Sequence, residues 1–167
     1  MARKVSLVLS HWYHLFEGMQ EAPGRFYDLL NQAVDRRKIP DIYVTTVTYR
    51  EGGLLSAKRV YFRVQRREHL FDICAAPFGA NAFFVSWWLG EAPGFLWELV
   101  LKIPFLGTAL LKMFRPYTYY RLDSALMFQE LVRSAVLEVV DFVSEAKGVR
   151  KLSELERKPI LSSFFQK

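Results

Sequence analysis

Residues 58–78 read KRVYFRVQRREHLFDICAAPF, and this stretch decides the fold. Two runs of β-branched and aromatic residues are separated by a short charged segment, Arg66-Arg67-Glu68-His69. Such a pattern is typical of two antiparallel strands joined by a tight turn. The sequence therefore predicts strands over Lys58–Arg67 and Leu70–Phe78.

The register of this predicted hairpin can be tested on its side chains. If it closes at Arg67 and Glu68, apolar residues face one another along one side of the two strands. The opposed pairs are then Val60 with Ala75, Phe62 with Ile73, and Val64 with Phe71. On the other side Arg63 lies opposite Asp72, so we expect a cross-strand ion pair.

Two further strands flank this hairpin, Ile42–Arg50 before it and Ala82–Leu89 after it, each bounded by glycine-containing turns. Four successive strands with short turns predict an antiparallel meander. Carrying the register into the last strand places Phe84 and Trp88 on the apolar face. The same register places Phe83, Val85 and Trp87 on the opposite face.

Helical periodicity appears on both sides of the strands. We expect a short helix from His11 to about Gln20, a second one from Pro23 to about Pro40, and a long one from about Leu122 to Lys147 ended by Gly148. The long helix is expected to pack on the sheet through Ala125, Phe128, Val132, Ala135, Val139, Phe142 and Ala146. The expected fold class is α+β, with residues 1–167 forming a single domain.

Residues 94–114 are the most apolar window of the chain. Glu98, Lys102 and Lys112 make a straight membrane span costly, and Pro104 with Gly107 divides the window into two short halves. We expect an apolar helical hairpin there. It either lies at a membrane interface or is buried against the sheet or a partner subunit.

Charge and composition favour an anionic neighbour. The formal net charge is +6, 51% of residues are hydrophobic and 16% are aromatic. A single cysteine excludes an intrachain disulfide framework. The start of the chain lacks a signal-peptide pattern, and the protein is expected to be intracellular.

Two sets of residues are candidate contacts. For a membrane or a partner they are Trp87, Trp88, Phe95, Leu96, Trp97, Leu99, Val100, Ile103, Phe105 and Leu106. For an anion they are Lys58, Arg59, Arg63, Arg66 and Arg67.

Catalytic and metal chemistry find little support. His11, His14 and Glu17 are too few for a zinc site, and Cys74 is expected to lie on the strand face opposite to His69. No phosphate-binding loop or nucleophile motif is present, so no cofactor or metal is expected.

The sequence thus favours a non-catalytic protein that contacts an anionic membrane surface. The alternative is a protein-interaction module, self-associating or part of a complex, that buries the hairpin. Nucleic-acid binding by the basic strand face is a weaker third reading.

Overall fold

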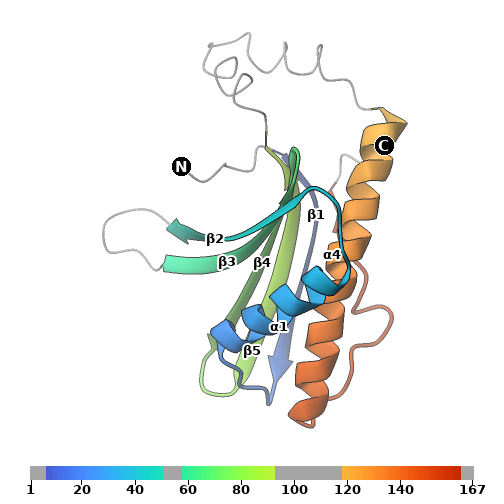
Figure 1. Ribbon diagram of the computed structural model, residues 1–167. Helices are drawn as coiled ribbons and strands as arrows, with labels where there is room; N and C mark the ends of the chain where they lie inside the picture. The colour runs from blue at the N-terminus through green and yellow to red at the C-terminus, as the bar shows by residue number, and fades with distance from the viewer. Residues whose placement is uncertain (1–6, 51–57, 93–117, 163–167) are drawn as a thin grey trace.

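The computed structural model describes residues 7–50, 58–92 and 118–162. It is an α+β structure with a six-stranded antiparallel sheet of order β2-β3-β4-β5-β1-β6 (Figure 1). In chain order the elements are β1 (Leu7–Glu17), α1 (Pro23–Arg36), β2 (Ile42–Arg50), β3 (Lys58–Arg66), β4 (His69–Phe78), β5 (Ala82–Glu91), α4 (Tyr119–Ala146) and β6 (Ile160–Leu161). The predicted four-stranded meander is therefore β2 to β5, extended by β1 and β6.

The central hairpin confirms the predicted register. Val64 pairs with Phe71, Phe62 with Ile73, and Arg63 with Asp72 across β3 and β4. The turn is as tight as predicted, and Arg67 takes the left-handed conformation there, with φ of 52°. Of the predicted apolar side chains, Phe62, Val64, Phe71, Ile73 and Ala75 lie in the core, whereas Val60 is exposed.

The prediction of which β5 side chains lie on the apolar face of the sheet is wrong, because the register of β5 differs from the predicted one by one residue. Phe78 pairs with Ala82, so the loop between them has an odd number of residues, 79–81. Gly79 adopts a positive φ of 65° in this loop. A one-residue change of register moves every side chain to the other face of a sheet. Phe83, Val85 and Trp87 consequently lie in the core, whereas Phe84 and Trp88 lie on the opposite face.

The helix predicted over 11–20 is wrong as well, because residues 11–17 belong to strand β1. Trp12 pairs with Trp87 and Phe16 with Phe83, so β1 completes the apolar face beside β5. Burial alternates along this part of the strand as a period of two requires, with Trp12 and Phe16 buried and Tyr13 and Leu15 exposed. Gly18, with φ of 72°, ends the strand region.

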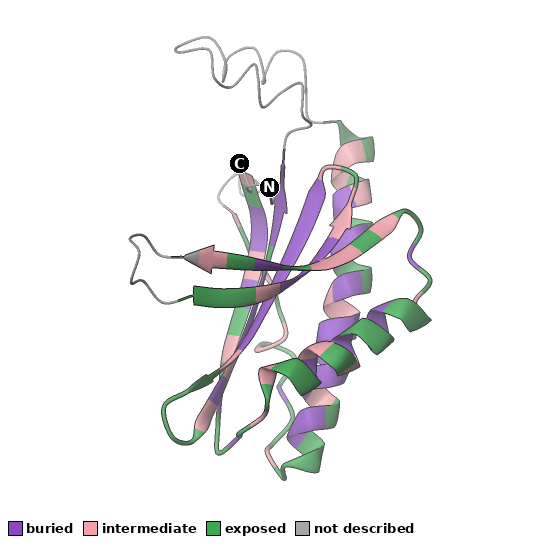
Figure 2. Ribbon diagram, turned by 60° about the vertical axis from the view of Figure 1, so that its left-hand side comes forward, coloured by how far each residue is buried: buried purple, intermediate pink, exposed green. Residues whose placement is uncertain are grey.

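Helices α1 and α4 cover one face of the sheet (Figures 1 and 2). The start at Pro23 and the left-handed Gly148 after α4 agree with the prediction. Most predicted inward positions of α4 are buried, but Phe142 is 55% exposed and Ala146 is also exposed, so these two assignments are wrong. Within the described residues, no helix is both long enough and apolar enough to cross a membrane.

Candidate functional site

Residues 93–117 connect β5 to α4 in the sequence, and the described residues on either side of them meet at one end of the sheet. Arg121, in the first turn of α4, binds Glu91 at the end of β5, with 2.9 Å between Nη2 and Oε2. Its Nε lies 3.7 Å from Oε1 of Glu68 in the β3–β4 turn. The backbone N–H of Ala92 donates to the carbonyl of Glu68 over 2.8 Å. The two ends of the segment are therefore tied together by contacts between described residues.

We call Glu68, His69, Glu91 and Arg121 the stem cluster, and this end of the sheet the stem end. His69 is buried, and its Nε2 lies 3.5 Å from Oε1 of Glu91. Its ring packs 6.3 Å from that of Phe128 in α4. Arg121 and Glu91 are mostly shielded from water, so their ion pair is stronger than an exposed one. The arrangement is a structural tie rather than an open reaction centre.

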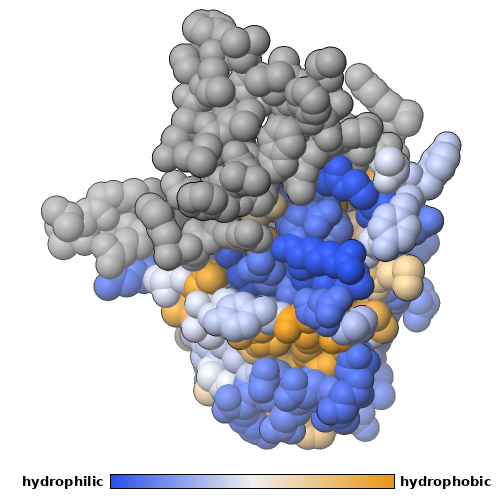
Figure 3. Space-filling view, turned by 45° about the horizontal axis from the view of Figure 1, so that its top comes forward, coloured by the Kyte–Doolittle hydropathy of each residue, from blue (hydrophilic) through white to orange (hydrophobic). Residues whose placement is uncertain are grey.

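Exposed aromatic and basic side chains surround the stem cluster. Tyr119 is 89% exposed and Tyr120 is 72% exposed at the start of α4. Arg66 and Arg67 lie in the adjoining turn, where Arg66 Nε donates to the carbonyl of Pro40 over 3.1 Å. Figure 3 shows hydrophilic surface over much of the described face in this view, interrupted by a hydrophobic area. The stem end therefore combines exposed tyrosines with arginines, of which Arg67 has its Nη2 3.8 Å from Oδ2 of Asp41.

Of the two tryptophans of β5 predicted as surface contacts, one is buried and one is exposed. Trp87 is fully buried, and its ring packs 4.8 Å from Phe71, so its assignment as a surface contact is wrong. The cause is the one-residue change of register in β5. Trp88 lies on the face opposite to the helices, 40% exposed, and stacks on His11 with 4.7 Å between ring centroids.

Arg63 is 2% exposed, and its guanidinium is used inside the sheet. Its Nε lies 2.6 Å from Oδ1 of Asp72 and its Nη2 lies 2.7 Å from Oδ2. Tyr49 accepts a hydrogen bond from Arg63 and donates one to Asp72. The expected ion pair is confirmed, and the expected anion contact at Arg63 is wrong because Asp72 already neutralises it.

The remaining predicted anion contacts do not form one patch. Lys58 and Arg59 begin β3, whereas Arg66 ends it and Arg67 follows in the turn. Eight steps of extended chain separate Lys58 from Arg66, which is roughly 26 Å at about 3.3 Å per residue. Only the pair Arg66 and Arg67 belongs to the stem end.

The other candidates gave no site. His11 and His14 lie on opposite faces of β1, and the described residues contain no group of three metal-ligating side chains. Cys74 is buried on the face away from His69, as expected from the strand alternation. The predicted contacts Phe95, Leu96, Trp97, Leu99, Val100, Ile103, Phe105 and Leu106 lie outside the described residues.

Sequence reasoning missed the stem cluster altogether. Glu68, Glu91 and Arg121 come from three elements, and only the fold brings them together. The one local signal was the adjacent pair Glu68-His69 in a tight turn, which by itself says nothing about partners. No protein-family model, curated protein or solved structure matches this chain.

Proposed function

We propose that the protein contacts an anionic membrane surface through its stem end and the adjoining apolar segment 94–114, without catalysing a reaction. The observation that supports this most is the tie made by Arg121 to Glu91 and Glu68. Because both ends of the segment meet there, its apolar residues are attached to the fold at one point. That attachment suits a shallow hairpin at a membrane interface better than a linker between separate parts.

The surroundings of this attachment fit the headgroup region of a bilayer. Tyrosine is enriched at membrane interfaces because its ring is apolar and its hydroxyl is polar. Tyr119 and Tyr120 are both exposed at the stem end. Arg66 and Arg67 add positive charge, and each basic residue near an anionic surface contributes about 1 kcal/mol.

Vesicle flotation tests this proposal. The full chain is mixed with vesicles of phosphatidylcholine alone or with added phosphatidylserine. We expect flotation with the anionic vesicles and a weaker response as salt is raised, because salt screens exposed charges. Absence of binding to both vesicle types would overturn the proposal.

Matched variants locate the contact. Phe95→Ser with Trp97→Ser should abolish flotation, and Tyr119→Ser with Tyr120→Ser should weaken it. Phe78→Ser is the control, because Phe78 is exposed at the opposite end of β4, next to the β4–β5 loop. Equal flotation of all these proteins would place the contact elsewhere. A stable oligomer that binds no vesicle would favour burial of the segment against a second chain instead.

A further inference from the structure

Strand β1 has an outer edge that is only partly used. On its inner side β1 pairs with β5 over nearly its whole length. On its outer side β6 pairs only with Ser10 and His11. Among the described strands, none lies beside the outer edge from Tyr13 to Glu17. An open sheet edge of this kind is a template for another strand.

The hydrogen bonding of β6 shows which groups point outward. Ser162 N donates to the carbonyl of Leu9 over 2.9 Å. Backbone groups of alternate residues point to the same side of a strand, so those of Tyr13 and Leu15 also point outward. From Ile160 to Ser162 the chain runs towards Leu9 and away from Tyr13. The strand β6 therefore leads away from the open part of the edge.

A cleft of about 290 Å³ borders this open edge on the side of the helices. It lies between β1 and the loop that follows α4. Its lining is mixed: Leu15, Phe16, Val149 and Leu152 are apolar, and His14, Glu17 and Arg150 are polar. Arg150 at its rim is held by Glu156, with 2.8 Å between Nη1 and Oε2. The cleft thus offers room for an apolar side chain next to an edge that no described strand covers.

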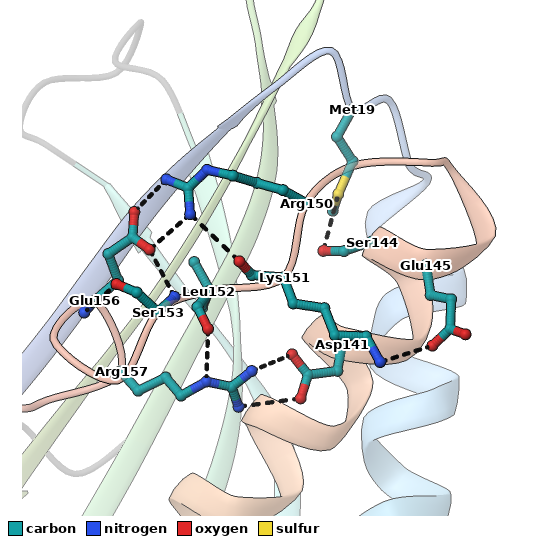
Figure 4. A network of polar contacts seen from close by, with 10 residues as sticks. All are labelled: Met19, Asp141, Ser144, Glu145, Arg150, Lys151, Leu152, Ser153, Glu156 and Arg157. Carbon is teal, nitrogen blue, oxygen red and sulfur yellow. Dashed lines mark hydrogen bonds and ion pairs between the residues drawn. The ribbon is translucent and has the colours of Figure 1, made fainter.

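The loop that forms the outer wall of this cleft is firmly held (Figure 4). Arg157 binds both carboxylate oxygens of Asp141 in α4, at 2.7 and 3.0 Å. Trp12 donates its indole N–H to the carbonyl of Glu156. A wall anchored to both α4 and β1 keeps the cleft open beside the strand.

We propose that the edge Tyr13–Glu17 of β1 binds an extended peptide segment of another protein, which adds a strand to the sheet and places an apolar side chain in the cleft. Backbone hydrogen bonds give such a contact its affinity, and the side-chain pocket gives it selectivity. The pairing of β6 on the same edge shows that this line of the sheet accepts a strand. Tyr13 and Leu15, exposed on the other face, add apolar contacts to that strand.

A peptide fits this edge better than a second copy of the chain. A second β1 paired here would bring its own loop 149–152 to the same side of the two strands. The two loops would then compete for the space beside the cleft. A single extended segment has no such loop. This proposal is independent of the membrane contact, which involves the opposite end of β1.

The test begins with selection of random linear peptides displayed on phage against the full chain. A selected peptide, made synthetically, should bind with a measurable Kd and slow the amide hydrogen exchange of Tyr13 and Leu15. In the free protein the same two amides should exchange rapidly, because no strand of the described residues pairs with them. Failure to select any peptide, or slow exchange in the free protein, would overturn the proposal.

A pair of variants tests whether the peptide binds in the cleft or elsewhere on the same loop. Val149→Trp fills the cleft and should weaken peptide binding by about tenfold or more, which corresponds to about 1.4 kcal/mol. Leu155→Trp is the control, since Leu155 is 76% exposed in the same loop and does not line the cleft. Equal Kd values for the two variants would refute the assignment of the cleft as the peptide site. Slowed amide hydrogen exchange confined to β2, at the opposite edge of the sheet, would refute it as well. A dimer that excludes the peptide would identify a second copy as the occupant.

Discussion

Arg63 and Asp72 are charged residues in one of the most buried parts of the sheet. Both carboxylate oxygens of Asp72 accept hydrogen bonds from the guanidinium, and Tyr49 joins them. Burial, followed by the charge of Asp72, raises the pKa of Tyr49. The tyrosine hydroxyl therefore stays protonated and able to donate. A buried charge without such partners would be costly, so the three side chains act as a unit.

Replacement of Arg63 by Leu should lower the free energy of unfolding by about 3–5 kcal/mol, because Asp72 then loses its buried counter-ion. Urea denaturation measures the change. Arg63→Leu combined with Asp72→Leu should recover much of the loss, since no uncompensated charge remains. Lys151→Ala is the control and should cost at most about 1 kcal/mol, because both members of its pair with Glu145 are exposed. A single variant as stable as the control would contradict this account.

Cys74 is the one cysteine of the chain and should be chemically inert in the folded protein. It is fully buried in β4, and burial raises the pKa of its thiol. The thiolate is the reactive form, so both access and ionisation disfavour modification. We expect a thiol reagent at pH 8 to label Cys74 only as urea unfolds the chain. Rapid labelling without urea would show that β4 is accessible on this face.

Among the elements, the loop after α4 is the one most dependent on polar contacts. Ser153 and Glu156 form the reciprocal pair expected of a capping box. The N–H of Ser153 donates to Oε2 of Glu156 over 2.7 Å, and the N–H of Glu156 donates to Oγ of Ser153 over 3.4 Å. In the structure this pair closes a turn. The same loop forms the wall of the β1 cleft.

The stabilisation by Glu156 should depend on pH. Its bonds to Arg150 and then to Ser153 hold the pKa of Glu156 below its ordinary value. A carboxylate whose pKa is lower in the folded state stabilises the fold above its unfolded pKa, and this contribution is lost as pH falls through the folded value. Wild type should therefore be more stable than Glu156→Gln at pH 7, and the gap should narrow below about pH 4. Thermal melts across this pH range measure the gap, and a constant difference would contradict the prediction.

The elements differ in how far local sequence determines them. The β3–β4 hairpin was predictable because Arg67 and Glu68 fix its turn, and both the facing of its apolar residues and the pair Arg63–Asp72 follow. The position of β5 in the sequence was predicted correctly, but its side chains were assigned to the wrong faces of the sheet. The reason is that three residues lie between the paired residues Phe78 and Ala82. β1 was misread as a helix because its pairing with β5 is a long-range contact that no local pattern shows. The stem cluster could not be predicted for the same reason.

On the scale of the whole molecule, one core joins both helices to the sheet. Its buried residues come from β1, α1, β3, β4, β5 and α4 and belong to one connected cluster. Phe128 of α4 packs on Phe71 with 6.2 Å between ring centroids, and Phe71 packs on Trp87. The helices thus have no separate core, and we expect them to unfold together with the sheet.

This expectation makes Phe128 a test of the two-layer arrangement. Phe128→Ala should lower the free energy of unfolding by about 3–5 kcal/mol, because it opens a cavity between α4 and β4. Circular dichroism follows α4, and tryptophan fluorescence follows the packing around Trp87. Both transitions should move together by the same amount, whereas Met127→Ala, on the exposed side of α4, should shift them by at most about 0.5 kcal/mol. If only the circular dichroism transition moved, α4 would be unfolding apart from the sheet, and the stem cluster would then hold the sheet to a helix with a stability of its own.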